Sequence, residues 1–193
     1  MFEVLYSHIE EKVKLSAQEK LDIATFFTFK KIRKKQYLLH EGDVCMNLTF
    51  ISKGLLKSYR VDDKGNEHIV VFGCEGWWLS DFNSFVNQQP ATLFIDAIED
   101  SEILLISRDE YERLTLEVPS MDRYFRILYQ NSLVTKEERL IRSNSHTAEE
   151  KFQHLMDYNP QIIQRVPQHL VASYLGLAPE TVSRIRKKLA SNN

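Results

Sequence analysis

Two short apolar runs near the C-terminus decide the fold prediction for this chain. Residues 166–193 read VPQHLVASYLGLAPETVSRIRKKLASNN. Apolar residues recur there at helical spacing, at Val171, Leu175, Leu177, Val182, Ile185 and Leu189. Gly176 separates the two runs and can take a positive φ, and Pro179 is tolerated only in the first turn of a helix. The pattern predicts two short helices, joined by a tight turn, that share one core around the small Ala172.

The polar face of the second predicted helix indicates DNA binding. Arg184 and Glu180 lie opposite the apolar residues. Arg can grip the edge of guanine with two hydrogen bonds, and Glu can accept one from cytosine. A helical hairpin with a solvated charged face is the alternative, and the spacing favours a helix-turn-helix. We expect base contacts from Arg184 first and Glu180 second. We expect phosphate contacts from Thr181, Ser183, Gln168, Lys187 and Lys188.

This stretch resembles the recognition helix of the Crp/Fnr family of bacterial transcription regulators. The run PETVSRIRKKL (residues 179–189) is similar to the family pattern R-E-T-V-x-R, with matches at Glu180, Thr181, Val182 and Arg184. Pro179 stands where the family often has an Arg that touches DNA, so the resemblance implies one contact fewer here. It also implies a homodimer whose two recognition helices, about 34 Å apart, read a roughly palindromic operator on double-stranded DNA.

The amino-acid composition is that of an ordinary globular protein. The chain has 193 residues, of which 43% are apolar and 27% charged, as in ordinary globular proteins. No apolar run approaches the roughly 18 residues of a membrane span, and the first residues lack a signal-peptide pattern. We therefore expect a cytoplasmic protein without a membrane partner. Cys45 and Cys74 lack metal-ligand spacing and are predicted to be core thiols.

Charge is unevenly distributed along the chain. Residues 160–193 hold five basic residues against one acidic residue, a net charge of +4. The other residues hold 20 basic against 26 acidic residues, a net charge of −6, which leaves −2 overall. This asymmetry supports nucleic-acid contact at the C-terminus and argues against DNA contact by the acidic remainder.

The middle of the chain, from residue 30 to about 107, has a strand-like pattern. Short runs rich in β-branched and aromatic residues alternate with glycines, and residues 62–66 (DDKGN) give a strong hairpin signal. Regularly spaced short strands predict a β sandwich or barrel. Residues 1–29 read as helix, with a capping-box pattern at Ser16 and Glu19. The predicted fold class is therefore α+β.

The strand-rich segment resembles the cyclic-nucleotide-binding jelly roll of the same family. The motifs HEGD (40–43), ISKG (51–54) and SEILLIS (101–107) carry this resemblance. The cAMP-binding members hold the ribose with a Glu and the cyclic phosphate with an Arg. The matching positions here are Ser80, Asp81 and Phe82, followed by Ala91 and Thr92. The resemblance thus implies an effector pocket at these residues, without the phosphate-binding Arg.

The alanine at position 91 predicts that cAMP is not the effector. A buried phosphate without a cation would carry a desolvation cost of several kcal/mol. Asp81 could keep a ribose-type acceptor, so a less charged small-molecule effector is one expectation. A pocket filled by Trp77, Trp78, Phe82 and Phe85 is the other. We predict no metal, no cofactor and no enzyme activity, because no His completes a nucleophile–base pair beside Ser80 and the remaining His and acidic residues are scattered.

The segment from Arg108 to Ser145 returns to helical spacing. A short helix is expected at 109–114, and a long helix is expected from a cap at Ser120 through Arg142. The long helix has apolar residues on more than one face, so it needs two partners. One is its own β-domain, and the resemblance implies that the other is the same helix of a second copy. Burial within one chain is the alternative.

A polar break at residues 143–147 sets the last domain boundary. Thr147 and Glu150 form a capping box that opens a helix at 148–158. We expect a sensor domain at 1–118, a dimerisation helix at 119–145 and a helix-turn-helix domain at 146–193. Residues 190–193 are too few for the β-hairpin wing that the family normally adds. The predicted function is a homodimeric, effector-controlled transcription regulator. The alternative is a ligand-binding module whose C-terminal helices serve protein interaction.

Overall fold

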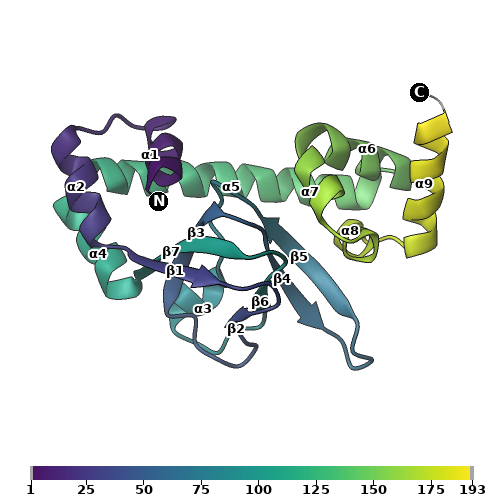
Figure 1. Cartoon of the computed structure of the whole chain (residues 1–193), viewed down its shortest axis with the longest axis horizontal. Helices are drawn as coiled ribbons and strands as arrows, with labels where there is room; N and C mark the ends of the chain where they lie inside the picture. The colour runs from purple at the N-terminus through teal and green to yellow at the C-terminus, as the bar shows by residue number, and fades with distance from the viewer. Residues whose placement is uncertain (1, 192–193) are drawn as a thin grey trace. The chain divides into compact units, whose positions relative to one another are not determined.

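The computed structural model describes residues 2–191 and confirms the α+β architecture. The helices are α1 (Glu3–Glu10), α2 (Ala17–Thr25), α3 (Phe82–Asn87), α4 (Arg108–Glu117), α5 (Pro119–Ser145), α6 (Ala148–Tyr158), α7 (Pro160–Arg165), α8 (Gln168–Leu175) and α9 (Pro179–Ser191) (Figure 1). The strands are β1 (Thr28–Ile32), β2 (Tyr37–Leu39), β3 (Asn47–Lys53), β4 (Leu56–Val61), β5 (Glu67–Gly73), β6 (Phe94–Ala97) and β7 (Ser101–Ser107). Among the described residues, no helix combines the length and apolar character needed to cross a membrane.

The chain forms two compact units. Within the described residues, the first unit holds the chain up to Arg60 together with Val71–Asn131. The second holds Val61–Val70 and the chain from Ser132 onward. This division differs from the expected boundaries in two respects. Helix α5 contributes to both units, and the tip of the β4–β5 hairpin belongs with the C-terminal helices.

The first unit is built around a two-sheet β-roll. One sheet has the strand order β1-β7-β3 and the other β2-β6-β4-β5. Strand β7 pairs antiparallel with β1 and with β3, where Phe50 lies opposite Leu104. Phe50 and Leu104 are fully buried. Helix α1 and the first part of α5 cover the β1-β7-β3 sheet (Figure 1). His8 of α1 packs against Phe50, with ring centroids 5.8 Å apart.

Local sequence signals explain where most elements begin. The capping box at Ser16 and Glu19 is present at the start of α2, and the one at Thr147 and Glu150 opens α6. Three expectations differ from the structure. Residues 2–29 contain two helices and the start of β1, α5 begins at Pro119 rather than after a Ser120 cap, and the strand-like segment contains α3. Because α3 has only six residues, it is too short to show a helical period in the sequence.

Four helices, α6 to α9, gather in the second unit around a small apolar core (Figure 1). Its buried side chains include Phe152, Leu155, Ile162, Leu170, Val171, Ala172, Val182 and Ile185. Gly176 ends α8 with a φ of 67°, and α9 begins at Pro179, both as expected. The expected lack of a wing concerns residues 190–193; helix α9 runs to Ser191, and residues 192–193 lie outside the described residues.

Candidate functional site

Helix α9 presents a polar face away from its core. Val182 and Ile185 anchor the helix, with exposures of 0% and 3%. Glu180, Arg184 and Lys187 are exposed on the opposite side. The helix is strongly amphipathic, and the exposed side has the residue types that reach base edges and phosphates in the major groove. The structure therefore brings the predicted base-contacting residues Glu180 and Arg184 onto one accessible face.

The remaining predicted contact residues of the helix-turn-helix have different environments. Thr181 and Ser183 are half-buried at the edges of that face. The side-chain amide of Gln168, at the start of α8, donates to the carbonyl oxygen of Pro179 at 3.2 Å. This bond ties the beginning of α9 to the beginning of α8. In this structure Gln168 acts on the turn between the two helices, and a phosphate contact would have to share its amide.

Lys188 has an acidic partner within the same unit. Its Nζ lies 3.0 Å from Oε1 of Glu149, in the first turn of α6. Glu149 was not among the predicted site residues. Because Glu149 lies 39 residues before Lys188, no local sequence pattern could predict this ion pair.

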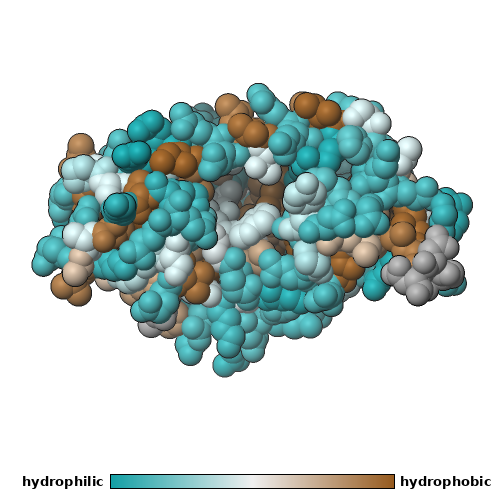
Figure 2. All heavy atoms as spheres, turned by 90° about the horizontal axis from the view of Figure 1, so that it is seen from above, coloured by the Kyte–Doolittle hydropathy of each residue, from teal (hydrophilic) through white to brown (hydrophobic). Residues whose placement is uncertain are grey.

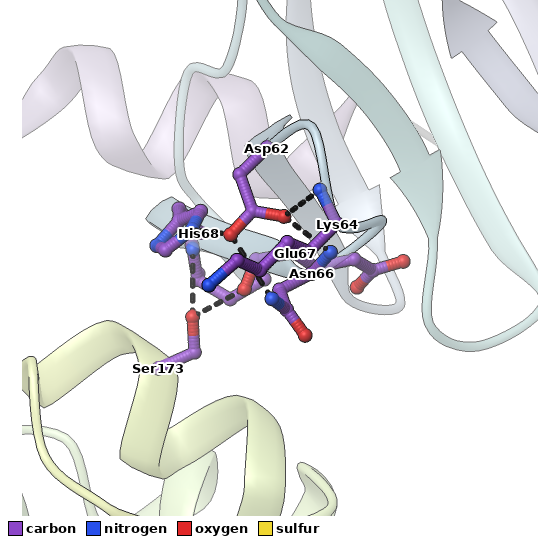
Figure 3. Close-up of polar contacts among 7 residues, drawn as sticks. Asp62, Lys64, Asn66, Glu67, His68 and Ser173 are labelled. Carbon is purple, nitrogen blue, oxygen red and sulfur yellow. Dashed lines mark hydrogen bonds and ion pairs between the residues drawn. The ribbon is translucent and has the colours of Figure 1, made fainter.

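The turn between β4 and β5 is held together by Asp62. Its Oδ1 accepts hydrogen bonds from the backbone N–H groups of Lys64 and Asn66, each at 2.9 Å. Its Oδ2 accepts from Asn66 Nδ2 at 3.0 Å and lies 2.9 Å from His68 Nε2. These bonds, first those from Asn66 and His68, hold the pKa of the Asp62 carboxyl below its ordinary value. The turn is therefore a preformed structure (Figure 3).

Helix α8 binds this hairpin through one serine. Ser173 Oγ donates to the carbonyl oxygen of Glu67 at 2.6 Å and accepts from the N–H of Ile69 at 3.0 Å (Figure 3). Arg139 of α5 donates to the carbonyl oxygen of Val70, and its guanidinium lies 4.3 Å above the ring of Tyr174. These bonds explain why Val61–Val70 belongs to the unit that carries the helix-turn-helix.

The residues predicted to form the effector pocket are mostly engaged with one another. Asp81 caps α3 by accepting from the N–H of Ser84 at 3.0 Å, and its second oxygen accepts from the N–H of Thr92 at 3.0 Å. Ala91 is buried, and its N–H donates to the carbonyl oxygen of Asp43 at 2.8 Å. Both Asp81 oxygens therefore bind backbone groups of the segment that would face the cyclic phosphate.

Ser80 alone of the five predicted pocket residues lines the cavity found in the β-roll. This cavity measures about 190 Å³. The apolar part of its wall is formed by Leu38, Leu39, Val44, Met46, Ile95 and Leu105. Ser80, Thr49, Asn47, Asp43 and Cys45 add polar groups. Burial raises the pKa of the Cys45 thiol, so the thiol stays neutral, and no Lys or Arg of the described chain lines the cavity.

The aromatic residues of this segment are divided between the core and the surface. The side chain of Phe85 is buried, whereas Trp77 and Phe82 are exposed, and the Phe82 ring lies 5.1 Å from that of Tyr129. Trp78 packs on Phe50 and donates from Nε1 to Tyr124 Oη at 2.7 Å. None of these rings lines the 190 Å³ cavity. No group of three or more His, Cys, Asp or Glu in residues 2–191 is arranged to hold a metal ion.

The C-terminal half of α5 exposes apolar side chains. Leu133, Val134, Leu140 and Ile141 are 54–63% exposed. They fall into two pairs seven residues apart, which places them on one side of the helix. Figure 2 shows separate hydrophobic patches on a mainly hydrophilic surface. A stripe of four such residues on one helix is the apolar second face that the sequence predicted for this helix.

Comparisons with known proteins show which proteins this chain is similar to. Residues 29–117 match the family model of the cyclic nucleotide-binding domain. The regulatory protein HlyX of Actinobacillus pleuropneumoniae is 28% identical over 81% of this chain and 69% of its own length. The fumarate and nitrate reduction regulatory protein of Vibrio cholerae is 28% identical over 81% of this chain and 66% of its own length. The chain thus spans about two thirds of these relatives.

Solved structures share the fold. FixK2 from Bradyrhizobium japonicum superposes with a TM-score of 0.70 at 20% identity, covering 86% of this chain and 85% of its own. The catabolite activator protein of Thermus thermophilus gives a TM-score of 0.57 at 20% identity, covering 96% of this chain and 87% of its own. With its nucleotide-binding-type β-roll and its C-terminal helices, the chain is similar to regulators of the Crp/Fnr type, and residues 29–117 match the cyclic nucleotide-binding domain.

Proposed function

We propose that this chain is a homodimeric transcription regulator that reads a roughly palindromic operator with helix α9. The exposed face of α9 supports the proposal, because Arg184 and Glu180 lie there while Val182 and Ile185 hold the helix in its core. The relatives named above carry the names of regulatory proteins, and the proposal includes no catalytic reaction. A DNA-binding role would place the protein in the bacterial cytoplasm.

A selection from random double-stranded DNA at moderate salt tests this function. We expect enrichment of one motif with two related half-sites about one helical turn apart. Salt-sensitive binding without any preferred sequence would contradict specific reading. That result would instead favour a small-ligand-binding module whose C-terminal helices bind another protein.

We further propose that the effector is not cAMP. The Asp81 oxygens are occupied by Ser84 and Thr92, and Ala91 offers no cation for a phosphate. The cavity of about 190 Å³ exceeds the roughly 150 Å³ that hold a benzene molecule in an engineered protein cavity. Its wall mixes apolar and polar groups and includes Asp43 but no Lys or Arg of the described residues, so it suits a small neutral molecule better than an anion.

Calorimetric titration of the full chain with cAMP tests the effector proposal. We expect no binding heat and no rise in DNA affinity at millimolar cAMP. Saturable binding that tightens operator binding would contradict it. A Thr49→Leu variant, which narrows the cavity, serves as a second probe once a neutral compound that binds has been found.

A further inference from the structure

Helix α6 places one acidic side chain beside the proposed DNA-reading helix. Glu149 follows the Thr147 cap directly, in the first turn of α6. Its neighbour Glu150 is engaged in the capping box, where it accepts from the N–H and Oγ of Thr147 at 2.8 and 2.9 Å. Glu149 takes no part in that cap. Its Oε1 instead meets the Nζ of Lys188 at 3.0 Å.

Helix packing fixes the distance between these two side chains. Phe152 of α6 and Ile185 of α9 are buried in the same small core. Glu149 and Lys188 line a groove of about 240 Å³ between the two helices, together with Ile185 and Leu189. The pair therefore needs no backbone movement to form.

The Glu149–Lys188 ion pair is too exposed to contribute much to the stability of the fold. The two side chains are 62% and 60% exposed, and exposed ion pairs contribute little to folding. The pair instead changes the charge that α9 offers to DNA. Lys188 is three residues after Ile185, so it lies on the flank of α9 that faces α6, beside the outward face with Arg184 and Lys187. A carboxylate there neutralises one cation and also repels a nearby phosphate.

We propose that Glu149 limits DNA affinity by holding Lys188 in this ion pair, so that Lys188 does not neutralise a phosphate. The proposal rests on the DNA-binding function proposed above. It assigns a role to Glu149 that the recognition helix alone would not suggest. The partner is the phosphate backbone, so the effect is on affinity and salt dependence, and the preferred base sequence should not change.

Salt dependence gives the test. Each phosphate that a cation neutralises adds about −0.9 to the slope of log K against log salt. We expect Glu149→Gln to steepen the slope by up to about 0.9 for each protomer, or up to about 1.8 for a dimer, and to raise affinity at about 0.1 M salt. In the Glu149→Gln variant, adding Lys188→Gln should return the slope of log K against log salt to the wild-type value. In the wild type, Lys188→Gln should change the slope less.

A matched control separates local from general charge effects. Asp157→Asn removes the same charge from α6, eight residues or about 12 Å along the helix from Glu149. It should change the slope by much less than Glu149→Gln does. Urea unfolding of each variant checks that the fold is kept. Independent, additive effects of Glu149→Gln and Lys188→Gln would overturn the proposal, and so would an equal effect of Asp157→Asn. A wild-type protein without salt-dependent DNA binding would overturn the proposed function as well.

Discussion

Arg184 is the residue on which sequence reading is expected to depend. It is exposed on α9, opposite the buried Val182 and Ile185. An Arg placed this way in the major groove can donate two hydrogen bonds to guanine. We expect Arg184→Ala to weaken binding to the selected operator by about 1–3 kcal/mol and to relax the preference at one base pair of each half-site. Fluorescence anisotropy with the operator and its single-base variants measures both effects.

Arg186→Ala is the control for this assignment. It removes the same charge from the same helix, on the flank away from Lys188. Binding to all sequences should weaken alike, without a change in the preferred base. If Arg184→Ala keeps the full base preference, or if Arg186→Ala loses it equally, Arg184 is not the reading residue.

His8 connects the first helix to the core of the β-roll and should make folding sensitive to acid. Its Nδ1 lies 2.7 Å from Tyr124 Oη, which also accepts from Trp78 Nε1. Burial, with repulsion from Lys12, lowers the pKa of His8 from 6.5 to about 4. The folded state thus binds the proton more weakly than the unfolded chain. Stability from this residue is present above about pH 6.5 and is lost as the pH falls towards 4.

We expect this acid-dependent loss to amount to about 1–2 kcal/mol, a value reduced for the solvent screening of a half-buried ring. Urea unfolding at pH 7.5 and pH 4.5 measures it. A His8→Gln variant should lack this part of the pH dependence while keeping the rest. The same pH dependence in wild type and His8→Gln would show that His8 does not titrate as described.

At the level of elements, the β4–β5 hairpin depends on α8 for its position in the second unit. Ser173→Ala leaves the N–H of Ile69 without its acceptor and the carbonyl oxygen of Glu67 without this donor. We expect the local opening of the hairpin to become about 1–2 kcal/mol easier. Hydrogen exchange at the Ile69 amide measures this change. Ser143→Ala, at an exposed position of α5, should leave that amide as protected as in the wild type.

We propose that helix α5 carries the contact between two copies. A stripe of exposed Leu and Val or Ile residues spaced by seven is typical of a helix that pairs with another helix. We expect Leu133→Glu to shift the protein from dimer to monomer in sedimentation equilibrium, because it places a charge in the apolar seam. Thr135→Glu, which points to the opposite side of the helix, should remain dimeric. A wild-type monomer at micromolar concentration would contradict the dimer.

For the molecule as a whole, the sequence was most informative where the signals are local. The capping boxes at Ser16 and Thr147, the left-handed Gly176 and the helix start at Pro179 each depend on residues within a few positions, and all four are present in the structure. The strand-to-helix order followed from hydrophobic periodicity, which is also a local property.

Features that depend on distant residues could not be predicted in this way. The bonds of Ser173 to the hairpin span 104 and 106 residues, and the bond between Lys188 and Glu149 spans 39. Asp81 was predicted to be a ligand acceptor from the family pattern. Its bonds to Ser84 and Thr92 arise because α3 forms inside a segment that reads as strand. Neither the long-range bonds nor a six-residue helix produces a recognisable periodicity in the amino-acid sequence.

Two recognition helices in one dimer should make operator spacing a strict requirement. A symmetric dimer places its two α9 helices on the same side of the DNA, about 34 Å or one turn apart. Inserting five base pairs between the half-sites turns one half-site to the opposite side of the duplex, so we expect affinity to fall to that of a single half-site. Electrophoretic mobility shift with operators carrying insertions of zero, two and five base pairs measures this dependence. The Leu133→Glu variant, if monomeric, should bind all three operators equally. Tight binding of the wild type to the five-base-pair insertion would mean that the two recognition helices are not held in register by one dimer.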